Sequence, residues 1–117
     1  MKNMLVLITK PPYGLEDAFA GLRFALTVVS NGMPTTVVML EDGVYNGIKG
    51  QKGSAISMPS NEDAISDLIA LEVPILLVKE SLESRNLPYQ KLNSFCKIVS
   101  EDEIREIVKN HQFIATF

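Results

Sequence analysis

The sequence predicts an α/β domain with a three-layer α/β/α arrangement around a five-stranded, mainly parallel sheet. Short apolar runs alternate with helical patterns along all 117 residues. Several of these runs are apolar at nearly every position, which is typical of strands buried on both faces. No repeat, linker or low-complexity segment interrupts the alternation, so residues 1–117 are predicted to form a single domain.

A change of apolar period marks the first strand and helix. Met4–Ile8 is apolar throughout, and Pro11 and Pro12 end it because proline cannot continue regular structure. Spacings of three and four then predict a helix that begins with acidic residues and ends at Asn31-Gly32. Its apolar positions are Leu15, Ala18, Leu22, Ala25, Leu26 and Val29.

The middle of the chain predicts two further strands around a long irregular segment. Thr35–Leu40 is the second strand, Asp42–Tyr45 a short helical turn, and residues 46–60 are irregular. Capping residues at Ser60–Asp63 begin a helix, which leads to the third strand, Val73–Val78. The apolar stripe of that helix is Ala64, Ile65, Leu68 and Ile69.

The last third of the chain completes the alternation. Lys79–Asn86 is predicted to form a short helix, and Phe95–Val99 the fourth strand. Ser100–Glu103 is a capping box, S-x-x-E, which begins another helix before the final strand, Gln112–Phe117. Five strands joined in this way suit the flavodoxin-like strand order 2-1-3-4-5.

Composition excludes several classes of protein. A formal net charge of -3 argues against a nucleic-acid-binding domain, because a phosphate backbone needs a basic face. The single cysteine cannot form an intrachain disulfide, which fits a reducing compartment. Met4–Ile8 is too short for a signal peptide, and no run approaches the roughly 18–20 apolar residues that span a bilayer. We therefore expect a cytoplasmic protein with no membrane contact and no direct nucleic-acid partner.

Sites in such a sheet form at the carboxyl ends of the strands. Four segments lie there: Thr9–Gly14, Glu41–Tyr45, Lys79–Ser81 and the neighbourhood of Ser100. The stretch "GIKGQKG" has glycines and lysines suited to a phosphate, but it neither follows a strand directly nor opens a helix. Small-anion or nucleotide binding is therefore an alternative, and a solvated loop is the simpler interpretation.

Two single residues complete the list of candidates. Cys96 is the one possible thiol nucleophile, but its place near the start of a strand puts it at the opposite edge from the expected site. We interpret it as a structural cysteine, with a reactive nucleophile as the alternative. His111 is the only histidine, so no usual zinc site is predicted. We predict no metal, no cofactor and no catalytic residue.

Four segments together resemble a known family. The loop "KPPYG" with its following helix, "EDGVYNGIKGQKG", "SLESRNLP" and the closing "IVKNHQFIATF" are similar to segments of the DsrE/DsrF-like sulfur-relay proteins, most closely the TusC/DsrF branch. The resemblance runs nearly end to end. It implies a domain that forms trimers or hexamers, by self-association or with paralogous subunits, and that takes part in cytoplasmic persulfide transfer, with a sulfur-carrier protein as a possible partner.

The resemblance also implies where function resides. Its DsrE/TusD branch has an active cysteine just after the third strand, and the matching position here is about Val78. We therefore predict a non-catalytic subunit that shapes a shared pocket and docks partners, with a sulfurtransferase that uses Cys96 as its persulfide carrier as the alternative. "EDGVYNGIKGQKG" is interpreted as a partner-facing loop, with Tyr45 and Ile48 as apolar contacts and Gly47, Gly50 and Gly53 providing adaptability. The predicted binding residues are Tyr13, Gly14, Asp42, Tyr45 and Lys79.

Overall fold

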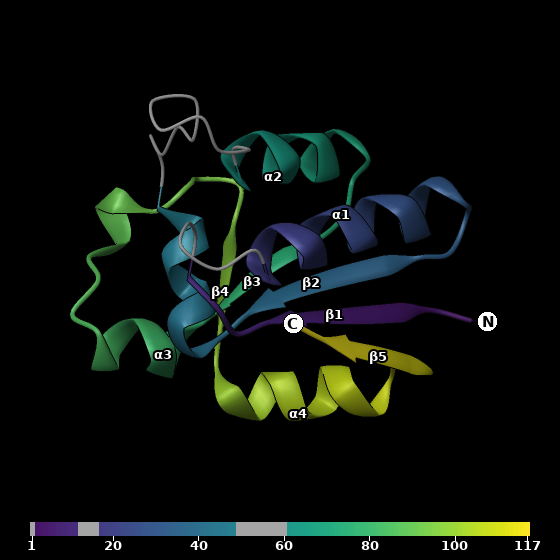
Figure 1. Cartoon of the computed structure of the whole chain (residues 1–117). Helices are drawn as coiled ribbons and strands as arrows, with labels where there is room; N and C mark the ends of the chain where they lie inside the picture. The colour runs from purple at the N-terminus through teal and green to yellow at the C-terminus, as the bar shows by residue number, and fades with distance from the viewer. Residues whose placement is uncertain (1, 12–16, 49–60) are drawn as a thin grey trace.

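A five-stranded parallel sheet forms the centre of the molecule (Figure 1). The computed structural model describes residues 2–11, 17–48 and 61–117. All the strands pair in parallel, in the order β4-β3-β2-β1-β5. They are β1 (Met4–Ile8), β2 (Thr35–Met39), β3 (Ile75–Val78), β4 (Lys97–Val99) and β5 (Phe113–Thr116). The predicted α/β class and the parallel sheet are confirmed.

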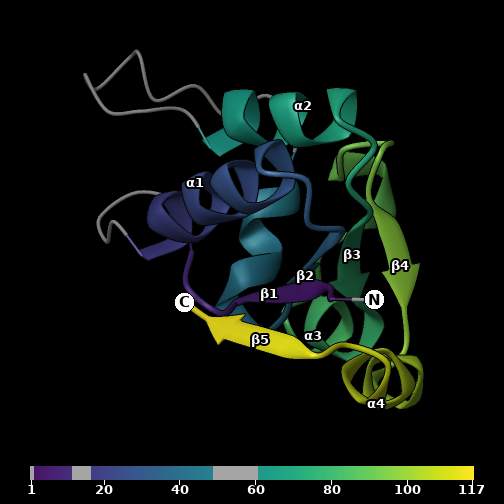
Figure 2. The same ribbon diagram turned by 90° about the vertical axis from the view of Figure 1, so that its right-hand side faces the viewer.

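Helices cover both faces of the sheet. α1 and α2 lie on one face, and α4 lies on the other (Figure 2). The α-helices are α1 (Asp17–Ser30), α2 (Asn61–Ala70), α3 (Lys79–Ser84) and α4 (Glu101–Lys109), and the 3-10 helices are η1 (Glu41–Gly47) and η3 (Tyr89–Lys91). The predicted alternation is confirmed, and η3 is an element that the sequence pattern did not predict. No helix in the described part of the chain is long and apolar enough to cross a bilayer.

The strand order differs from the predicted 2-1-3-4-5. The chain steps from β1 through β2 and β3 to β4, and then crosses back so that β5 pairs with the free side of β1. The two edge strands are therefore β4, which has three residues, and β5, whose Phe113 and Ile114 are 40% and 46% exposed. The alternation of strands and helices predicts the number of strands and their parallel direction. It does not predict the strand order, because each crossover can place the next strand on either side of the previous one.

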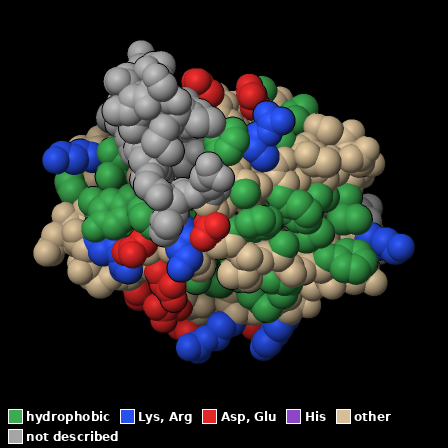
Figure 3. All heavy atoms as spheres, in the orientation of Figure 1, with side chains coloured by type: hydrophobic (Ala, Val, Ile, Leu, Met, Phe, Trp, Pro, Cys, Tyr) green, Lys and Arg blue, Asp and Glu red, His purple; other side chains and the backbone are tan. Residues whose placement is uncertain are grey.

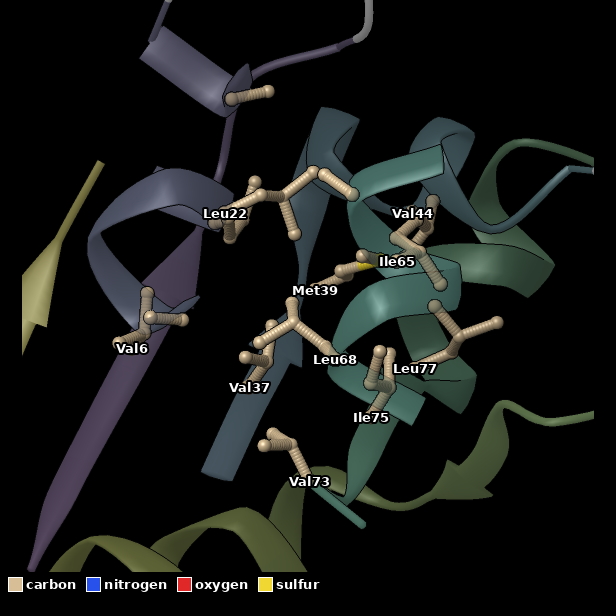
Figure 4. Packing of buried hydrophobic residues seen from close by; sticks show 14 of the residues in the cluster. Val6, Leu22, Val37, Met39, Val44, Ile65, Leu68, Val73, Ile75 and Leu77 are labelled. Atoms are coloured by element: carbon tan, nitrogen blue, oxygen red, sulfur yellow. The ribbon is translucent and has the colours of Figure 1, made fainter. Parts of the chain in front are cut away.

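The hydrophobic core has two unequal parts. The larger part fills the space between the sheet and the α1 and α2 side, where Leu22 and Leu68 meet Val37 and Leu77 (Figure 4). The smaller part lies under α4, on the other face of the sheet, and includes Val78. α4 has no fully buried residue, because one short helix cannot cover that face. This leaves room for a hollow beside α4.

The start of α4 follows the predicted capping box. The N–H of Glu103 donates to Ser100 Oγ at 3.2 Å, and the N–H of Ser100 donates to Glu103 Oε1 at 3.3 Å. Two donors that a helix end leaves unpaired are thereby satisfied. The same turn is fixed to the strand ends by Glu80, whose Oε1 accepts the N–H of Glu101 at 3.1 Å. The first turn of α4 is therefore held at the carboxyl edge of the sheet.

Candidate functional site

The helix η1 lies directly on the carboxyl end of β1. Leu40 donates its N–H to the carbonyl of Ile8 at 3.0 Å, and Gly43 donates to the carbonyl of Leu40 at 2.9 Å. A Cβ atom at position 43 would lie only 1.9 Å from the Ile8 carbonyl oxygen. Gly43 is therefore required by this close approach of two backbones, a use that only glycine allows.

A buried amide joins η1 to the first loop. Asn46 is 3% exposed, and its Nδ2 donates to the carbonyls of Lys10 at 2.9 Å and Gly43 at 3.0 Å. Because the Asn46 amide is buried, these two hydrogen bonds satisfy a polar group that would otherwise destabilise the fold. The Asn of "EDGVYNG" is thus a structural residue.

The end of η1 is packed and paired, which corrects part of the sequence interpretation. A Cβ atom on Gly47 would lie 2.9 Å from the Leu77 side chain, so this glycine permits tight packing and does not provide adaptability. The N–H of Asn93 donates to the Gly47 carbonyl at 2.7 Å, and Ile48 forms an antiparallel bridge with Leu92. Up to residue 48 this segment is therefore fixed structure and not a loop. Gly50 and Gly53 lie outside the described residues.

Contacts between η1 and α3 form the rim of the site. The N–H of Glu41 donates to Ser81 Oγ at 2.9 Å, and the Arg85 Nε donates to Asp42 Oδ1 at 3.0 Å. Arg85 also donates from Nη1 to the Ser81 carbonyl at 3.2 Å. Glu41 has φ 54°, in the left-handed region that non-glycine residues rarely adopt. These hydrogen bonds hold that unusual backbone in place.

A hollow of about 250 Å³ opens between these strand ends and α4. Its apolar walls are Leu40, Val78 and Ile104. Its polar lining comes from the residues Glu41, Ser81, Glu101 and Arg105. Val78, at the junction of β3 and α3, is only 2% exposed. The hollow therefore combines an apolar floor with a charged rim.

The five predicted binding residues do not share one environment. Asp42 and Lys79 are exposed at the carboxyl edge, Asp42 in its ion pair with Arg85 and Lys79 as the first residue of α3. Tyr45 is partly buried in η1. Tyr13 and Gly14 lie outside the described residues. The structure thus brings Asp42 and Lys79 to one edge.

Sequence reasoning named the strand-end segments that contain Glu41, Ser81 and Glu101, but it predicted neither Arg105 in the lining nor the contacts of Arg85 on the rim. Ser81 and Arg85 lie on or after a short helix whose sequence gives no sign of long-range contacts, and Arg105 belongs to an ordinary polar helix face. For Ser81 the useful signal was position, because it falls just after the third strand, where sites form in parallel sheets.

Cys96 lies where the sequence predicted, away from this site. It is partly buried beside the larger core cluster, just before β4 and hence at the amino edge of the sheet. Burial raises the pKa of the Cys96 thiol from 9.0 to about 11. Since the thiolate is the reactive form, this thiol is a poor nucleophile at neutral pH.

We expect Cys96 to react slowly with iodoacetamide in the native protein. Taking 9.0 and about 11 as the pKa values of the unfolded and folded states, the thiolate fraction at pH 8 is lowered about 100-fold by folding. The raised pKa also contributes stability that is complete below pH 9 and is lost as the pH rises toward 11. Alkylation rates measured from pH 6 to 11, with and without denaturant, check this. A native rate that reaches its plateau near pH 7 would contradict it.

His111 also lies at the amino edge. Its Nδ1 donates to the Ile107 carbonyl at 2.7 Å, and its Nε2 is 3.3 Å from Thr36 Oγ1. These contacts connect α4 to β2, so His111 has a structural role at this position. Within residues 2–11, 17–48 and 61–117, no three His, Cys, Asp or Glu side chains group as metal ligands.

Comparison with known proteins identifies the family. The model of the DsrE/DsrF-like family matches residues 2–116. The protein MJ0989 of Methanocaldococcus jannaschii is 30% identical over 112 residues, which cover 96% of each chain. The intracellular sulfur oxidation protein DsrF of Allochromatium vinosum is 30% identical over 112 residues, which cover 93% of this chain and 82% of the relative.

Solved structures show the same fold. The ychN protein from E. coli superposes with a TM-score of 0.91 at 23% identity, and all of both chains is covered. The protein MTH1491 from Methanobacterium thermoautotrophicum gives a TM-score of 0.72 at 10% identity, again over all of both chains. The resemblance drawn from the four sequence segments is thus confirmed at the family level, while the TusC/DsrF branch stays a prediction. The chain belongs to the DsrE/DsrF-like family.

Proposed function

We propose that this protein is a non-catalytic subunit of a sulfur-relay assembly, in which it shapes a pocket and docks partners without carrying sulfur itself. The observation that supports this most directly is Val78. The family resemblance implies an active cysteine at about this position in the DsrE/TusD branch, and here a buried branched hydrocarbon borders the hollow. Valine can neither accept nor release a sulfane sulfur.

The remaining thiol does not replace the missing one. Cys96 lies at the amino edge of the sheet, whereas the hollow lies at the carboxyl edge. Its raised pKa lowers its thiolate fraction further. A persulfide carrier needs an accessible thiolate, so neither its position nor its protonation favours Cys96 as a carrier. A sulfurtransferase that uses Cys96 is therefore a weaker proposal than a non-catalytic subunit.

Exposed apolar side chains support assembly with other subunits. Phe95, just before β4, is 67% exposed, and Phe113 and Ile114 on β5 are 40% and 46% exposed. Both strands are edges of the sheet, and unpaired edges with apolar side chains favour association with another chain. We propose paralogous DsrE/DsrF-like subunits, or further copies of this chain, as the partners in a trimer or hexamer.

Light scattering on mixed subunits tests this proposal. The chain is mixed with a DsrE/DsrF-like paralogue that has a cysteine after its third strand, and molar mass is measured for each protein and for the mixture. We expect a species that contains both chains, or a homo-oligomer of this chain. In parallel, mass spectrometry after incubation with a persulfide donor should show the adduct on the paralogue. A monomer that never joins the paralogue, or a persulfide on native Cys96, would sink the proposal.

A further inference from the structure

The hollow beside α4 contains a hydrogen-bond donor that no described residue accepts. Ser81 is 9% exposed, and its Oγ accepts the N–H of Glu41 at 2.9 Å. Among the described residues, the hydroxyl proton of Ser81 has no acceptor. A buried hydroxyl usually donates as well as accepts, so this proton marks a place for an acceptor atom from another molecule.

The apolar walls define what can enter the hollow. Leu40 lies between β2 and η1, Val78 ends β3 and Ile104 belongs to α4, and the three side chains border a space of about 250 Å³. Such a space accommodates an aliphatic side chain, whose transfer from water is favourable in proportion to the area it buries. The occupant therefore combines a hydrogen-bond acceptor with an apolar group, as a peptide segment does.

Charge decides what surrounds that apolar group. η1, α3 with the following Arg85, and residues Glu101–Arg105 of α4 contain seven acidic and three basic side chains. Figure 3 shows acidic side chains gathered between α3 and the start of α4. Among the described residues, Arg105 is the one cation that lines the hollow, and it already donates to Asp102 Oδ1 at 3.2 Å. No contact within the described residues neutralises the exposed carboxylates of Glu41 and Glu101 on the same rim.

We propose that this hollow docks a basic peptide segment of a partner protein, in which an aliphatic side chain is flanked by lysine or arginine. The aliphatic side chain enters between Leu40, Val78 and Ile104. A main-chain carbonyl of the segment accepts the Ser81 proton, and the flanking cations pair with Glu41 and Glu101. The inference rests on the proposed function, because it gives the chemistry of the partner that the non-catalytic subunit docks.

A titration followed by ¹⁵N–¹H spectra of the full chain tests the inference. The probes are two acetylated and amidated tripeptides, Lys-Leu-Lys and its charge-reversed counterpart Glu-Leu-Glu. We expect Lys-Leu-Lys to shift the amide signals of Leu40, Ser81 and Glu101, and to bind about tenfold more tightly than Glu-Leu-Glu. Raising the salt concentration should weaken its binding, since exposed charges are screened.

A matched pair of double variants locates the effect. Glu41→Gln with Glu101→Gln removes the two carboxylates that line the hollow, and we expect Lys-Leu-Lys to bind about fivefold more weakly. Glu72→Gln with Glu106→Gln removes the same charge outside the lining, so affinity should stay within about twofold of the original. Amide shifts confined to other surfaces, equal binding of the two tripeptides, or equal weakening by both variants would overturn the inference. None of these outcomes affects the light-scattering test, which measures subunit mass and needs no peptide.

Discussion

Replacing Gly43 with alanine will destabilise the fold by about 3 kcal/mol or more, because the new methyl group has no space. Its Cβ would lie 1.9 Å from the Ile8 carbonyl oxygen. That oxygen cannot move away freely, since it accepts the N–H of Leu40 at 3.0 Å. Urea unfolding followed by circular dichroism measures the change, and a failure to accumulate folded protein would be its extreme form.

Gly32→Ala is the matched control. Gly32 has φ +92°, and a Cβ atom there meets nothing within 4 Å. The cost is then conformational only, about 1–2 kcal/mol for a non-glycine residue in the left-handed region. The comparison separates loss of space from loss of backbone freedom. If the two variants unfold at the same urea concentration, η1 does not lie against β1 as the structure shows.

Replacing Asn46 with alanine will cost about 2–3 kcal/mol, because it leaves two carbonyls without the donor that a buried side chain provides. The carbonyls are those of Lys10 and Gly43, at 2.9 and 3.0 Å from Nδ2. The residue Asn46 is 3% exposed, so water cannot replace the lost donor unless the surrounding residues rearrange. Chemical unfolding gives the free-energy difference.

Asn31→Ala provides the comparison for that measurement. Its Nδ2 also donates to a carbonyl, that of Thr27 at 2.8 Å, but on an exposed surface. Water can replace that donor, so the expected change is within about 0.5 kcal/mol. Equal costs for the two substitutions would show that the amide of Asn46 is not buried in solution. The hydrogen bond by which Asn46 joins η1 to the first loop would then contribute nothing beyond a surface contact.

Local chemistry was sufficient to predict most elements of this fold. Met4–Ile8 is a strand in the sequence pattern and in the structure, because a short unbroken apolar run is typical of a strand buried on both faces. The helix that follows Ser100 begins where its capping box places it, because both partners of that box lie within one turn. Family membership was also predictable, since it depends on residues that lie together in sequence.

The candidate site was predictable only in outline. The rule for strand ends placed Asp42 and Lys79 at the correct edge. It did not predict that Arg85 would pair with Asp42 across 43 residues, or that Ser81 would accept the N–H of Glu41 across 40. Short polar segments such as α3 and Arg85 have no periodicity that would reveal their partners.

The sequence by itself determined most of the strand and helix pattern, the parallel class of the sheet and the absence of a cysteine near Val78. Only the tertiary structure decided the strand order, the packing of η1 and the hollow beside α4. A strand or a cap depends on groups a few residues apart, which the chain brings together in any fold. Which strand pairs with β1 depends on how the whole sheet is buried. The hollow depends on it too, because α4 covers its face of the sheet only in part.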